Sequence, residues 1–87
     1  MKKKDIKKKI IEQYKKVFKK QNKESSPPKI KDSTLIIDTG IDSLGFAILV
    51  TNLEEELNYD PFTLSTEAFY PQTMGEFIKF YEKYYQR

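Results

Sequence analysis

The spacing of apolar residues predicts an amphipathic helix near the start of the chain. Between residues 4 and 20 the apolar positions recur every three or four residues, which places them on one side of an α-helix. Lysines fill most of the other positions, so we expect the opposite side to face water. The apolar positions are Ile6, Ile10, Tyr14, Val17 and Phe18.

A long polar connection follows this helix over residues 21–41. It contains Pro27 and Pro28, and proline cannot continue a helix. The connection also holds a short apolar run, Leu35-Ile36-Ile37, for which the rest of the chain offers no β partner. We therefore interpret the run as a loop segment that its aliphatic side chains hold against the core.

Two more helices are predicted after the connection. The first covers residues 43–57, because Asp42 is a favoured N-cap and Asn58 is a favoured stop. The last begins with a capping box, in which Thr73 precedes Glu76 by three positions. Between them, residues 65–69 are consistent with one short helical turn.

These elements predict an all-α fold. Helices must bury their apolar sides on one another, so we expect a small bundle of three to four helices with a long loop between helix one and helix two. The chain has 87 residues, the size of a single domain. We assign residues 1–87 to one domain and expect residues 1–3 to be disordered. No apolar run approaches the ~20 residues of a membrane span.

The second helix is predicted to have two apolar sides. Phe46, Leu49 and Leu53 share the side that would face the core. The other side carries aliphatic residues next to an acidic helix end, which is typical of a docking surface that attracts a basic partner. A solvated acidic helix end is the alternative. The outward residues are Leu44, Ala47, Ile48, Thr51, Glu54 and Glu55.

Composition excludes several kinds of catalysis. The chain has no cysteine, which removes disulfides and thiolate metal sites, and no histidine, which removes the commonest general base and metal ligand. Acidic residues are numerous, but they fall in a helix end and in loops, and nothing in the sequence places two of them around a cleft. We therefore expect that the chain is not an enzyme.

Charge is divided unevenly along the chain. Residues 1–31 hold 13 of the 16 basic residues and three acids, a net charge of +10. Residues 32–87 hold three basic residues and ten acids, a net charge of −7. Such a division is typical of chains whose parts meet different partners.

Ser43 is the residue with the clearest candidate chemistry. It would lie in the first turn of the second helix, directly after a glycine-containing loop and the Asp42 cap. No histidine or adjacent lysine is available to activate its hydroxyl, so it is a poor nucleophile by itself. A serine that is presented without being activated suits modification by another enzyme, although a plain helix-start serine looks the same.

The region around Ser43 resembles the acyl carrier protein family. That family shows Asp-Ser-Leu after a loop glycine, then an amphipathic helix that ends in an acidic patch. Here the corresponding residues are Gly40, Asp42-Ser43-Leu44 and the Leu53-Glu54-Glu55-Glu56-Leu57 end. The resemblance covers about residues 33–85. The first helix matches only as an amphipathic helix before a long loop.

The resemblance implies a cofactor and a set of partners. Ser43 would carry 4′-phosphopantetheine, installed from coenzyme A by a carrier-protein synthase, with Asp42 and Leu44 beside it. The arm would hold acyl or aminoacyl groups as thioesters, supplied by a loading ligase and used by downstream transferases. Leu44, Ala47, Ile48 and Thr51 would form the docking face, and Glu54 and Glu55 would pair with basic residues of these enzymes.

The chain also departs from ordinary members of that family. Its first 31 residues are strongly basic, Gly45 lies inside the first turn of the second helix, and Ile48 stands where many members are acidic. Gly45-Phe46 and the Tyr59-Asp60-Pro61-Phe62 segment resemble specialised carriers, which serve for example surface-polysaccharide or secondary-metabolite pathways, rather than the housekeeping carrier. We expect a cytoplasmic monomer.

A different class of function is a basic binding module. The lysine-rich first helix could contact nucleic acid or an anionic surface. Against nucleic acid, the segment has no arginine, and Tyr14 and Phe18 belong to the core stripe, so no aromatic platform is free for base stacking. A solvated lysine face is the simpler interpretation, and we expect no nucleic-acid partner.

Overall fold

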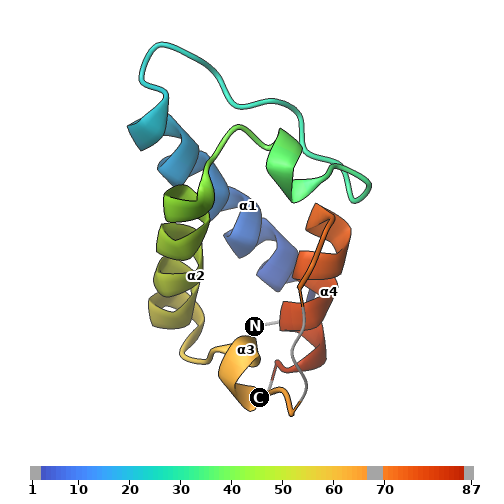
Figure 1. Ribbon diagram of the computed structural model, residues 1–87. Coiled ribbons are helices and arrows are strands. Elements are labelled where there is room, and N and C mark those ends of the chain that lie inside the picture. The colour runs from blue at the N-terminus through green and yellow to red at the C-terminus, as the bar shows by residue number, and fades with distance from the viewer. Residues whose placement is uncertain (1–2, 67–69, 86–87) are drawn as a thin grey trace.

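The computed structural model describes residues 3–66 and 70–85. Within these ranges the chain forms α-helices, one short 3-10 helix and no strand beyond an isolated bridge, which confirms the all-α prediction. Figure 1 shows α1 running between α2 and α4, with α3 at the opposite end of the molecule from the α1–α2 connection. The elements are α1 (Lys3–Gln21), η1 (Ile36–Asp38), α2 (Ser43–Leu57), α3 (Pro61–Leu64) and α4 (Met74–Lys83).

Helix α1 is the centre of the bundle and packs on both α2 and α4. Its predicted apolar stripe is confirmed, because every member is at most 4% exposed. Burying five large side chains on one side is the main force that holds this lysine-rich helix in place, since each contributes roughly 1.5–3 kcal/mol. The stripe consists of Ile6, Ile10, Tyr14, Val17 and Phe18.

The predicted capping box starts α4. The Thr73 hydroxyl accepts from the Glu76 backbone N–H at 3.1 Å, and the Glu76 carboxylate accepts from the Thr73 backbone N–H at 3.0 Å. The backbone N–H groups of Gln72 and Thr73 lower the pKa of Glu76. Below this cap, α4 buries Phe77 and Tyr81 against the core, as well as Met74, Ile78 and Phe80.

The helical turn predicted at residues 65–69 is not seen at Ser65 and Thr66, and a short helix lies earlier in the chain. The short helix is α3, four residues earlier, because Asp60 caps it by accepting from the Phe62 N–H at 2.9 Å and Pro61 fits its first position. Ser65 already has extended backbone angles and ends α3. Residues 67–69 of the predicted turn lie outside the described residues.

The predicted boundaries of the long loop also need correction. Gln21 is the last residue of α1, and Ile36–Asp38 form η1. The apolar run does have a β partner, because Leu35 forms an isolated antiparallel bridge with Thr73. Only Ile36 packs against the core, whereas Ile37 is 84% exposed, since a 3-10 turn directs successive side chains to different sides.

The chain start differs from the prediction as well. Lys3 is the first residue of α1 rather than part of a disordered segment, and residues 1–2 lie outside the described residues. Lysine is a good helix former, and Ile6 anchors the same turn in the core. Among the described residues, no helix is both long and apolar enough to cross a bilayer.

Candidate functional site

Ser43 is the first residue of α2, and its side chain is exposed. The preceding residue, Asp42, is the N-cap, as predicted. Its Oδ1 accepts from the Gly45 backbone N–H at 2.8 Å and from the Gln21 side-chain Nε2 at 2.9 Å. Both donors lower the pKa of Asp42, the Gly45 N–H most strongly, so this carboxylate is ionised and fixed at neutral pH.

Gly45 is explained by the approach of α1 to the start of α2. A Cβ at this position would lie 2.6 Å from Oε1 of Gln21, the side chain that binds Asp42. Gly45 is buried, and its lack of a side chain lets the end of α1 reach the cap. Alanine would improve helix propensity by ~1 kcal/mol, but its Cβ would displace the flexible Gln21 side chain and so disturb the contact that fixes the residue before Ser43.

The loop that leads to Ser43 is held by α1. Gly40 has a φ of +85°, and a Cβ there would lie 2.6 Å from the Phe18 ring, so both backbone conformation and space favour glycine. The Asn22 side chain donates to the Gly40 carbonyl at 3.2 Å, and the buried Tyr14 hydroxyl donates to the Thr39 carbonyl. The backbone before Ser43 is therefore fixed at several points.

The structure brings the predicted docking residues together on one exposed side of α2. All six are exposed, with Leu44 at 66% and Ile48 at 39%. The Thr51 hydroxyl donates to the Ala47 carbonyl at 3.0 Å. Leu44, Ala47 and Ile48 give the half of this side nearer Ser43 its aliphatic character. Glu54 and Glu55 make the half near the end of α2 acidic. That it binds partners stays a prediction.

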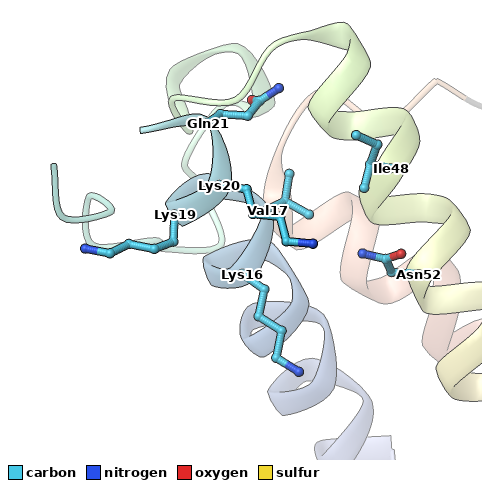
Figure 2. A pocket seen from close by; sticks show the side chains of 7 residues that line it. All are labelled: Lys16, Val17, Lys19, Lys20, Gln21, Ile48 and Asn52. Atoms are coloured by element: carbon cyan, nitrogen blue, oxygen red, sulfur yellow. The ribbon is translucent and has the colours of Figure 1, made fainter. Parts of the chain in front are cut away.

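Ile48 is less exposed than Leu44 because it lies at a groove between α1 and α2 that the sequence did not reveal. Figure 2 shows Ile48 and Asn52 on α2 facing the last turns of α1. The helical periodicity assigned Val17 to the core and the lysines to solvent, but it contains no information on how closely two helices cross. The groove is lined by Lys16, Val17, Lys19, Lys20, Gln21, Ile48 and Asn52.

Among the described residues, the ion pairs of Lys7 and Lys9 tie the basic first helix to the acidic remainder of the chain. Lys7 lies 3.2 Å from Asp32, and Lys9 lies 3.0 Å from Glu56. The pair with Glu56 raises the pKa of Lys9. Both pairs are exposed to solvent, so each adds little stability. Glu56 thus faces α1, unlike its neighbours Glu54 and Glu55.

The site around Ser43 presents a hydroxyl group at the molecular surface. In the described part of the chain, no group of three or more acidic side chains is placed to hold a metal ion. What the site offers is an exposed hydroxyl at a fixed helix start, beside an ionised cap and an aliphatic surface. Comparison of the chain with protein-family models, with curated proteins and with solved structures finds no match.

Proposed function

We propose that this chain is a carrier protein whose Ser43 bears a 4′-phosphopantetheine arm, and that the arm holds acyl or aminoacyl groups as thioesters. One observation carries the proposal: the exposed Ser43 hydroxyl follows a cap that two hydrogen bonds and an anchored loop hold in place. A fixed acceptor is what a modifying enzyme needs, since positioning supplies much of its rate.

Loading of the arm is a phosphoryl-group transfer from coenzyme A. The Ser43 oxygen forms a bond to the phosphorus next to pantetheine while the diphosphate bond of coenzyme A breaks. Adenosine 3′,5′-bisphosphate leaves, and the hydroxyl proton goes to a base of the synthase. The chain has neither histidine nor cysteine, so the base and the thiol both come from outside it.

The exposed side of α2 supports the partner part of the proposal. Leu44, Ala47, Ile48 and Thr51 offer apolar contact directly below Ser43, and Glu54 and Glu55 offer negative charge. Such a surface suits transient docking of a synthase, a loading ligase and downstream transferases, because charge speeds encounter and a small apolar area permits release. We place this carrier in the cytoplasm, as a monomer and a specialised rather than housekeeping member of its family.

The proposal is tested by intact-mass measurement after incubation with coenzyme A and a broad-specificity carrier synthase. Wild type should gain the mass of one phosphopantetheine group, and Ser43→Ala should gain nothing while keeping its helical circular dichroism. Ser33→Ala, which removes an exposed loop serine, is the matched control and should be modified as wild type. Unmodified wild type, or modified Ser43→Ala, would contradict the proposal.

A further inference from the structure

The outer side of α1 carries a row of exposed lysines, Lys8, Lys15 and Lys19. Their spacing of seven and four residues returns them to the same side of the helix. This side lies opposite the buried stripe that contains Ile10. Glu12 is exposed next to the lysine row and offsets one of its charges. The row therefore remains basic along about 17 Å of helix.

The loop after α1 widens this basic surface. A depression of about 360 Å³ lies between α1 and the loop. Lys15 of the row and Lys29 of the loop both line it, so two segments of the chain bring positive charge to one place. The depression is also partly apolar, because Ile11 and Ile30, which line it too, are only partly buried.

The charge of these lysines is not neutralised by the protein itself. Among the described residues, ion pairs engage Lys7 and Lys9, and neither the lysine row nor Lys29 takes part in one. The exposed acidic residues Glu54 and Glu55 lie on α2 instead. The outer side of α1 is therefore left to attract an anionic partner.

The chemistry of this surface favours a partner that is bound by charge. Protein interfaces are usually anchored by large aromatic or aliphatic side chains. Of the described residues, the large apolar ones that are well exposed all lie outside α1. Tyr14 and Phe18 are buried, so they cannot stack on bases. Phospholipid headgroups need no such anchor, because they are mobile in the bilayer and can gather around lysines, each of which adds to binding.

We propose that the outer side of α1, together with Lys29, binds the surface of an anionic phospholipid bilayer. In this arrangement the lysine row lies along the headgroups, and a lipid phosphate sits between Lys15 and Lys29. The helix rests on the bilayer without inserting, because its apolar stripe stays in the protein core. Ser43 lies on α2, so this contact does not depend on its modification.

The test is co-flotation of the full-length, unmodified protein with phosphatidylcholine vesicles that contain phosphatidylserine, at about 0.15 M salt. We expect binding that weakens as salt rises and that is absent with phosphatidylcholine alone. Lys15→Gln/Lys29→Gln should weaken binding by roughly 10- to 30-fold, because each lysine near an anionic surface contributes several-fold. Its helical circular dichroism should match that of wild type, since exposed charges add little stability.

Lys79→Gln/Lys83→Gln is the matched control. It makes the same change in net charge at exposed lysines of α4, outside the lysine row and the depression. This variant should bind the vesicles as wild type does. Equal weakening by both double variants would show that only the net charge of the protein matters, and it would overturn the assignment to α1.

Other outcomes would overturn the proposal as well. These are a lack of binding to the phosphatidylserine vesicles, or equal binding to vesicles without phosphatidylserine. Duplex nucleic acid and polyglutamate serve as competing anions in the same assay. Tighter binding to either of them than to the vesicles, lost in Lys15→Gln/Lys29→Gln, would assign this surface to a nucleic acid or to an acidic protein instead.

Discussion

The hydroxyls of Tyr59 and Tyr81 differ in their hydrogen bonding. The Tyr59 hydroxyl donates to the Tyr81 carbonyl at 2.7 Å, and burial raises the pKa of Tyr59 to about 12. The Tyr81 hydroxyl is buried, and within the described residues it has no hydrogen-bond partner. A buried polar group without a partner costs stability, whereas a hydrogen-bonded one contributes about 1 kcal/mol.

This difference predicts opposite effects of the same substitution. Tyr59→Phe should lower the free energy of unfolding by about 1 kcal/mol, because it removes a hydrogen bond. Tyr81→Phe should leave it unchanged or raise it by up to about 1 kcal/mol, because it removes the unsatisfied hydroxyl and keeps the ring. Urea unfolding of both variants measures this. A larger loss for Tyr81→Phe than for Tyr59→Phe would show that the Tyr81 hydroxyl is bonded.

The Asp42 cap should make stability depend on pH. Its pKa is lowered in the folded protein by the Gly45 N–H and by Gln21, so the ionised form favours folding. The stabilisation is fully present above the unfolded pKa of about 3.9 and is lost as pH falls through the lower, folded value. The difference in melting temperature between wild type and Asp42→Ala should therefore shrink from about pH 5 downward.

Asp42→Asn is the control for this titration. Asparagine is an equally good N-cap but carries no titratable group. Its advantage over Asp42→Ala should stay constant over the same pH range. If the wild-type advantage also stayed constant, the carboxylate would not be the group that stabilises the cap. Glu76, whose pKa is lowered in the same direction, is present in all three proteins and cancels in the comparison.

At the scale of helices, the sequence predicted the elements that have a strong periodicity or a specific cap. The five-residue stripe defined α1, Asp42 and Asn58 bounded α2, and the Thr73–Glu76 capping box started α4. The short helix α3 was not predicted, although Asp60 followed by proline was its signal in the sequence.

Features made by contact between distant segments could not be predicted. The groove depends on the crossing of α1 and α2, and the bond from Gln21 to Asp42 joins residues 21 positions apart. The bridge between Leu35 and Thr73 likewise joins the long loop to the start of α4. Each depends on how the helices of the whole bundle pack, and the local spacing of residues carries no information on that packing. The exposure of Ser43 was predictable, because a first-turn residue after a cap usually points outward.

The two sides of α2 should differ in their contribution to stability. Leu53 is fully buried, so Leu53→Ala should lower the free energy of unfolding by about 2–5 kcal/mol. Ile48 is 39% exposed and contacts a groove, so Ile48→Ala should cost about 1 kcal/mol or less. Chemical denaturation measures both. Equal losses would mean that α2 presents a different side to the core.

At the scale of the whole molecule, the division of charge is also a division in space. The basic residues 1–31 include α1, whose lysines Lys8, Lys15 and Lys19 are exposed, whereas the acidic end of α2 exposes Glu54 and Glu55. The ion pairs of Lys7 and Lys9 connect the two parts without neutralising either. The same molecule thus exposes an acidic helix end and a basic helix face.

The exposed lysines of α1 predict weak rather than tight contact with nucleic acid. The aromatic residues Tyr14 and Phe18 are buried in the core, so the lysines would have to bind phosphates without base stacking. Replacing Lys8, Lys15 and Lys19 by glutamine should change the free energy of unfolding by less than about 1 kcal/mol, because exposed charges contribute little. Urea unfolding of the triple variant tests this expected change in stability.

The expected weak contact with nucleic acid is tested by titration with single-stranded and duplex nucleic acid. The salt concentration is about 0.15 M, where exposed charges are screened over about 8 Å. We expect no binding at micromolar protein concentration. Micromolar or tighter binding that weakens steeply with salt, and that the triple glutamine variant loses, would assign the basic face to nucleic acid. Such binding would not decide the role of Ser43. Ser43 and the basic face belong to different helices, and no substitution in the triple variant touches the cap that positions Ser43.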